Sequence, residues 1–184
     1  MVEPENIDDF NQKNVPTCTV VDIIEKYGKP YYVKIDIEGY DHKILRHLLE
    51  SGFKPPYISV ESHSFEIIAI LVALGGYNSF QLVEGSEVAK TYKDIDIETM
   101  SGIQRYSFSN HSAGPFGHDL SGDWLCADDF LIELAKQGLG WRDIHASTVI
   151  KPKPPRIRLP VNATLRMKLG RTRRELIQKF INKS

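Results

Sequence analysis

The chain has 184 residues, 41% hydrophobic and 26% charged, a composition typical of one globular domain and not of a disordered or membrane-embedded protein. Its longest apolar run, residues 67–74, is far shorter than the roughly 20 residues that span a bilayer. Two cysteines without a CxxC pair exclude a disulfide framework. Because residues 1–10 are polar and acidic and do not resemble a secretory leader, we expect a cytoplasmic location.

Charge is distributed unevenly along the chain, although the formal net charge is only −1. Residues 151–184 contain eleven Lys or Arg and a single acid, Glu175, so the rest of the chain is acidic. A Pro-rich run at 151–155 separates the two regions. We therefore expect a polar N-terminal segment at 1–15, an α/β domain at 16–150, and a Pro-rich linker with a basic tail at 151–184.

Helical and strand patterns alternate through the first half of the chain. The run Thr19-Val-Val-Asp22 resembles a capping box, with Asp in place of the usual Glu, and Gly28 favours an end of the helix that it opens. β-Branched and aromatic runs predict strands, and apolar residues at helical spacing predict the helices between them. The predicted strands are 31–37, 57–61 and 79–83, and the helices that connect them are 41–50 and 65–74.

This order of elements predicts a parallel βαβαβ sheet with right-handed crossovers, of the partial Rossmann-like kind. The first strand, 31–37, is expected to be buried on both faces because it is apolar and aromatic. Farther along, we expect a last strand at 104–109 antiparallel to 79–83, a loop at 110–119 and a short helix at 128–137.

Acidic residues and a histidine stand where the three predicted strands end. They are Asp36, Glu38 and Gly39 after the first strand, Glu61 and His63 at the second, and Glu84 at the third. Because ligands bind outside the carboxyl ends of strands in open parallel sheets, we expect these residues at one edge. Such a cluster can shift pKa values and provide a general base, or hold a divalent cation through oxygen ligands.

Each of these residues also has a purely structural interpretation. Acids at strand ends commonly cap helices or stay solvated, and His63 is equally consistent with a hydrogen-bonded structural role. The group Asp36, Glu38 and Gly39 favours a site, because glycine permits a backbone path that a side chain would forbid. We expect no structural metal, since the chain has no HExxH motif and no Cys/His set with zinc spacing, and no ligand spacing demands a calcium or magnesium site at Asp36, Glu38 and Glu61.

The run Lys34-Ile-Asp-Ile-Glu-Gly39, with Thr19-Val-Val-Asp-Ile-Ile24 before it, resembles the FkbM family of S-adenosylmethionine-dependent methyltransferases. The family pattern is a T-x-x-D-x-[IL] helix, a strand reading [LV]-K-[IL]-D-[IV]-E-G, and a helix with x-[VI]-L, here Ile44-Leu45. The resemblance covers about residues 17–85, and 111–117 resembles a subgroup of the family. It implies a Rossmann-like fold, S-adenosylmethionine as cofactor, and methyl transfer to an oxygen of a sugar or small metabolite.

Carried over residue by residue, Asp36, Glu38 and Gly39 occupy signature positions beside the cofactor and acceptor cleft, with Asp36 and Gly39 at the cofactor. Glu61 and His63 complete the expected catalytic set. Family members begin with a strand and a D-x-G-A-N-x-G turn, whereas no glycine precedes Gly28 here. We therefore expect the C-terminal half of such an enzyme, either as a fragment of a longer protein or as a chain that has lost its cofactor site.

Without the first half, strand 31–37 is left with an apolar edge that favours pairing with another chain. We expect a homo-oligomer or a partner chain that supplies the missing strands. The tail predicts a basic amphipathic helix at 173–181, which docks on the acidic domain, contacts an anionic membrane or partner groove, or, least favoured, binds nucleic acid. The alternative to a methyltransferase with a small-molecule acceptor is a non-catalytic interaction module that binds through this edge and tail.

Overall fold

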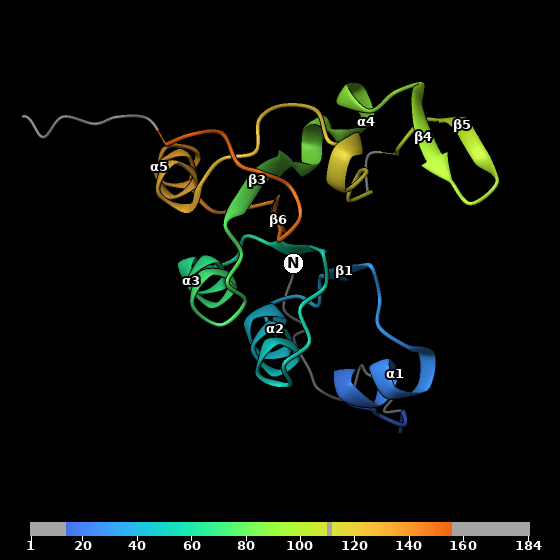
Figure 1. Ribbon diagram of the computed structural model, residues 1–184, viewed down its shortest axis with the longest axis vertical. Helices are drawn as coiled ribbons and strands as arrows, with labels where there is room; N and C mark the ends of the chain where they lie inside the picture. The colour runs from blue at the N-terminus through green and yellow to red at the C-terminus, as the bar shows by residue number, and fades with distance from the viewer. Residues whose placement is uncertain (1–13, 110–111, 156–184) are drawn as a thin grey trace, which may run out of the picture. The chain divides into compact units, whose positions relative to one another are not determined.

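The computed structural model describes residues 14–109 and 112–155, so the predicted tail helix lies outside the described residues (Figure 1). The chain divides into two compact units after Lys153, and every described helix and strand belongs to the first. In chain order these are α1 (Val20–Tyr27), β1 (Tyr32–Ile35), α2 (Asp41–Glu50), β2 (Tyr57–Glu61), α3 (Phe65–Ala73), β3 (Ser79–Glu84), η2 (Gly85–Glu87), α4 (Val88–Thr91), β4 (Ile95–Thr99), β5 (Gly102–Tyr106), η3 (Gly117–Asp119), α5 (Ala127–Gln137) and β6 (Arg142–Ser147).

The main sheet has four strands in the order β1-β2-β6-β3. β1 and β2 are parallel, whereas β6 runs antiparallel to β2 on one side and to β3 on the other. The three strands predicted from the alternation therefore point the same way, but β6 lies between the second and the third. The α/β class is confirmed, while a parallel Rossmann-like sheet is not, because the sheet is mixed.

Sequence patterns did not identify β6. Its sequence contains a single β-branched residue, Ile144, among charged and small residues, so it lacks the enrichment that predicts a strand. The strand expected at 104–109 overlaps β5, but β5 pairs with β4 in a separate hairpin and not with β3. The predicted pairing of this strand with 79–83 was wrong, because β5 is exposed along its whole length and, among the described strands, pairs only with β4, the strand that precedes it in the sequence.

The apolar face of the main sheet is covered by α2, α3 and α5 (Figure 1). Leu45, Leu48 and Leu49 of α2 are buried there, as the helical stripe predicted. Side chains from all four strands complete this core: Ile35, Ile58, Val60, Phe80, Ile144 and Ala146. Alternation along each strand then sends the remaining side chains to the opposite face.

β1 is less buried than its sequence suggests. Only Ile35 of its four residues is buried, and the other three are half-buried. The prediction of burial on both faces was wrong because β1 is the outermost strand of the sheet within the described residues, and strands gain full burial only when covered on both sides. α1, which lies next to β1 in the chain, has no buried residue.

Candidate functional site

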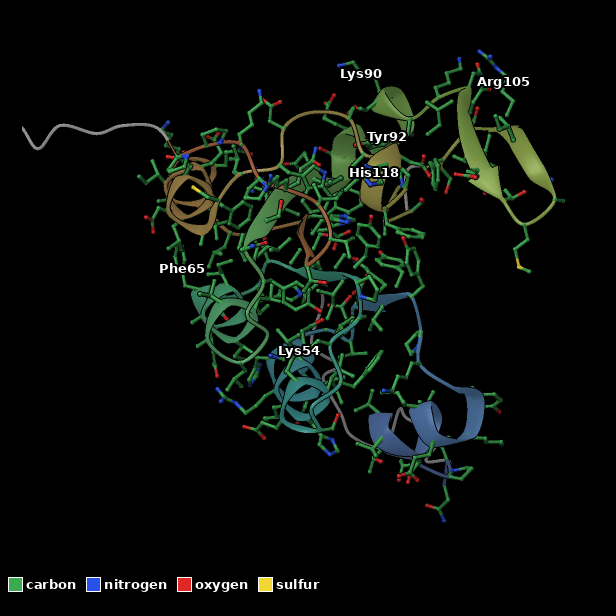
Figure 2. All side chains as sticks on the ribbon, viewed as in Figure 1. Lys54, Phe65, Lys90, Tyr92, Arg105 and His118 are labelled. Carbon is green, nitrogen blue, oxygen red and sulfur yellow. The ribbon has the colours of Figure 1, made fainter. Side chains whose placement is uncertain are left out.

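The second face of the main sheet is polar and buried. Cross-strand register places Ser59 of β2 and Gln81 of β3 on either side of His145 of β6, and all three are buried. Residues 112–121 cover this face: Phe116 stacks on Tyr32 with ring centroids 4.2 Å apart, and the Gln81 amide donates to the Ser121 carbonyl. In Figure 2, His118 marks this covering segment.

At the end of this polar face, four charged side chains form what we call the rim cluster: Lys34, Asp36, Glu61 and Asp143. The Lys34 ammonium is ion-paired with Asp143 and lies 3.7 Å from Asp36. Glu61 and Asp143 are register partners, because β6 begins where β2 ends. The structure thus brings Asp36 and Glu61 to one rim, where the sequence analysis placed them.

The rim cluster lines a small cavity of about 40 Å³. The other lining residues are Gly85, Ser112, Ala113, Trp141 and Arg142. Trp141 packs directly over Gly85, since a side-chain carbon at that glycine would lie 2.8 Å from the indole. The cavity therefore combines an aromatic wall with carboxylates and an ammonium group.

Glu61 is the strongest candidate base in the rim cluster. Burial raises the pKa of the Glu61 carboxyl, the neighbouring His63 lowers it, and the carboxylates of Asp36 and Asp143 raise it again. His63 Nε2 lies 2.9 Å from Glu61 Oε2, on the more exposed side of the pair. A carboxylate whose pKa is raised toward neutrality is a better proton acceptor than an ordinary surface carboxylate.

Asp143 was not identified from the sequence, although it belongs to the rim cluster. Burial raises the pKa of the Asp143 carboxyl, and the Lys34 ammonium opposes that rise. No local pattern marks this residue, because β6 itself carried no strand signal. Lys34 alternates along β1 with the apolar residues Val33 and Ile35, and this alternation would have placed it on the polar face.

The turn after β1 is organised by a buried carboxylate that sequence analysis also missed. Asp41, the first residue of α2, accepts hydrogen bonds from the backbone amides of Ile37 at 3.2 Å and Gly39 at 3.0 Å. Gly39 has φ +94°, which explains the glycine, and Glu38 also adopts a positive φ of 51°. Both residues are exposed, and neither lines the rim cavity.

Glu84 joins two strands of the sheet and does not belong to the rim cluster. Its carboxylate lies 2.7 Å from Nε of Arg142 and accepts a hydrogen bond from the Ser86 hydroxyl at 3.2 Å. It is not among the residues that line the rim cavity. Of the three predicted strand ends, the first two therefore supply the rim cluster, and the third holds β3 to β6.

His145 is enclosed in the polar face and differs from the exposed His63. Burial, with a smaller contribution from the Lys34 charge, lowers the pKa of His145 to about 3. Its Nε2 has no hydrogen-bond partner among the described residues, and the same holds for Gln81 Oε1 on the neighbouring strand. The imidazole is therefore neutral at physiological pH.

Residues 14–109 and 112–155 contain no cluster of three or more His, Cys, Asp or Glu side chains placed to hold a metal ion. Within the same residues, Cys18 and Cys126 are both free thiols, and no helix is long and apolar enough to cross a membrane.

Comparison with protein families bears on the carboxylate-bearing strands. The model of the FkbM methyltransferase domain matches residues 2–89, slightly less than half of the chain. The resemblance to the FkbM methyltransferase family is confirmed. The FkbM-matched segment contains β1, β2 and β3, and with them Lys34, Asp36 and Glu61, whereas Asp143 and Trp141 lie beyond it. No curated protein and no solved structure matches the chain.

The family implies S-adenosylmethionine, and the described residues can be tested against a molecule of that size. The rim cavity of about 40 Å³ is far below the roughly 300–1,000 Å³ of small-molecule sites. The chain also lacks a D-x-G-A-N-x-G turn. The rim cavity by itself is therefore too small to enclose the cofactor.

Proposed function

We propose that this chain takes part in S-adenosylmethionine-dependent O-methylation of a small metabolite or sugar, and that its rim cluster forms the acceptor side of the site. The observation that carries the proposal is Glu61, a partly desolvated carboxylate of raised pKa that lies in the FkbM-matched segment and lines the rim cavity. Methylation of an oxygen requires removal of the hydroxyl proton, which is the task that such a carboxylate performs.

In this proposal the residues of the chain position the hydroxyl and move its proton. Glu61 accepts the proton, and His63, bonded to Glu61 and more exposed, relays it to solvent. The Lys34 ammonium stabilises the negative charge that develops on the oxygen. Trp141 provides an apolar wall against which the body of the acceptor packs.

The alternative function is a non-catalytic interaction module. Two observations within the described part of the chain favour it: a strand edge is unpaired, and no cofactor-sized polar pocket surrounds the rim cluster. On this alternative the carboxylates and Lys34 hold the sheet together and bind no acceptor.

Calorimetric titration of the full chain with S-adenosylmethionine separates the two functions. The methyltransferase proposal expects one saturable site, weakened about tenfold by Asp36→Asn because the family resemblance places this carboxylate beside the cofactor. Asp96→Asn is the matched control, since Asp96 is an exposed carboxylate on the β4–β5 hairpin. Absence of saturable binding to the wild-type chain would overturn the enzymatic proposal and favour the interaction module.

A further inference from the structure

The outer edge of β1 is available for strand pairing. The Tyr57 amide donates to the Tyr31 carbonyl at 3.3 Å, which shows that odd-numbered residues of β1 direct their backbone groups toward β2. The amides and carbonyls of Tyr32, Lys34 and, just past the strand, Asp36 therefore point away from the sheet. No strand in residues 14–109 or 112–155 pairs with them.

An apolar cleft lies beside this edge. It has a volume of about 340 Å³ and is lined by one side of α1, by 33–37 and by Ile44 and Leu48 of α2. Ile23 of α1 lines it and remains 46% exposed. α1 has no buried residue and lies beside the unpaired edge of β1. The cleft between them therefore has room for apolar side chains of an added strand.

The residues at this edge are self-complementary. From 33 to 37 the order is apolar, Lys34, apolar, Asp36, apolar, so the pattern is symmetric about Ile35 with opposite charges at equivalent positions. Two copies related by a two-fold axis bring the same surface together, and a strand with this pattern meets its own complement when it runs antiparallel.

We propose that β1 pairs antiparallel with β1 of a second copy of this chain, with Ile35 opposite the partner's Ile35. In this register Lys34 lies opposite the partner's Asp36, and the outward backbone groups of both residues form the hydrogen-bonded pair. The apolar residues on the other face enter the cleft beside α1.

Charge selects this register over its neighbours. A shift by two residues in one direction places Lys34 opposite the partner's Lys34, and in the other direction places Asp36 opposite the partner's Asp36. The second shift would also bring Lys34 level with Glu38, but Glu38 has a φ of 51° and lies in the turn beyond the strand, so it provides no cross-strand pair. Like charges directly opposite are unfavourable, whereas opposite charges stabilise a pair. A shift by one residue would place residues with outward-pointing backbone groups opposite residues whose backbone groups point toward β2, so the hydrogen bonds between the two copies of β1 could not form.

The pairing has a consequence for the rim cluster. Side chains directly opposite in an antiparallel pair lie on the same face, so the partner's Asp36 joins the face that carries Lys34 and Glu61. The second copy thus contributes a carboxylate next to each rim. This inference does not depend on methyl transfer, because it follows from the edge, the cleft and the charges alone.

Sedimentation velocity of the full chain over a range of concentrations tests the pairing. We expect a concentration-dependent monomer–dimer equilibrium. Asp36→Lys should raise the dissociation constant about tenfold, because it replaces two attractive cross-strand pairs with two repulsive ones. The matched control is Asp96→Lys, which changes an exposed hairpin carboxylate and should leave the equilibrium unchanged.

Mixing two charge variants makes the test specific to the register. A Lys34→Glu copy and an Asp36→Lys copy each repel themselves but complement each other, so the mixture should form heterodimers. Should Lys34→Glu fail to fold, Ile23→Glu in the cleft should still weaken the dimer, whereas Ile103→Glu on the hairpin should not. A monomer at all concentrations, or a dimer insensitive to both Asp36→Lys and Ile23→Glu, would overturn the inference.

Discussion

Glu61 and His145 lie on neighbouring strands of one buried polar face, and burial shifts both toward their neutral forms. Removal from water disfavours charge, so the pKa of the carboxyl rises and that of the imidazole falls. Nearby charges then distinguish the two. The carboxylates of Asp36 and Asp143 raise the pKa of Glu61 further. The Lys34 ammonium lowers the pKa of His145 further.

Asp36→Asn should lower the pKa of Glu61 toward the ordinary glutamate value. The substitution removes a neighbouring negative charge that now disfavours ionisation of Glu61. Carbon-detected NMR titration of the side-chain carboxyl measures the shift, with Asp96→Asn as the control. An unchanged Glu61 titration in the Asp36→Asn protein would contradict the geometry of the rim cluster.

His145 should make the protein less stable in mild acid. Because the folded pKa of about 3 lies below the ordinary 6.5, its stabilising contribution is complete above about pH 6.5 and declines toward pH 3. At pH 5 the loss is about 2 kcal/mol.

The raised pKa values of Glu61 and Asp143 act with the opposite sign, so the measurement compares wild type with His145→Gln. Chemical denaturation should show the stability advantage of wild type shrinking by about 2 kcal/mol from pH 7 to pH 5. A pH-independent difference would show that the imidazole is not held neutral by burial.

At the scale of single elements, local signals decide the boundaries. The capping box at Thr19 is present as expected, with the Thr19 amide donating to the Asp22 carboxylate at 2.7 Å, and Gly28 is the C-cap of the helix. α2 and β2 occupy the predicted residues. Their bounds could be predicted because caps, turns and apolar spacing depend on residues that are only a few positions apart in the sequence. The two helices differ in how much they contribute to the core: α2 has buried leucines, while α1 has no buried residue.

Because α1 lacks buried residues, its cap should contribute a large share of its local stability. Thr19→Ala should destabilise the helix by about 1 kcal/mol and raise amide exchange in α1 roughly fivefold. Ser64→Ala is the matched control, since Ser64 is the N-cap of α3 but makes no side-chain capping bond. Equal exchange in α1 of the wild-type and Thr19→Ala proteins would show that packing, not the cap, holds this helix.

At the scale of the described domain, β6 connects β2 and β3, which do not pair with each other. It hydrogen-bonds to β2 along one edge and to β3 along the other, and it delivers Asp143 to Lys34. The FkbM-matched segment ends at residue 89, so the strand between its second and third strands comes from outside it. The matched segment is therefore not a complete sheet by itself.

A chain truncated to residues 1–89 should not fold cooperatively. It would expose the edges of both β2 and β3, and it would lose Ile144, Ala146 and the α5 side chains from the core. Far-ultraviolet circular dichroism with thermal unfolding measures this, and a chain of residues 1–155 serves as the control. A sigmoidal unfolding transition for residues 1–89 would show that the helices and parallel pair suffice.

The sequence by itself determined helices α1, α2, α3 and α5, the three like-directed strands and the meeting of Asp36 with Glu61, because each rests on short-range periodicity or on the direction of a strand. Only the tertiary structure decided that β6 lies between β2 and β3 and that Asp143 pairs with Lys34. The physical reason is that pairing between distant strands depends on which backbone edges are left over after local elements form, and no local pattern encodes that choice.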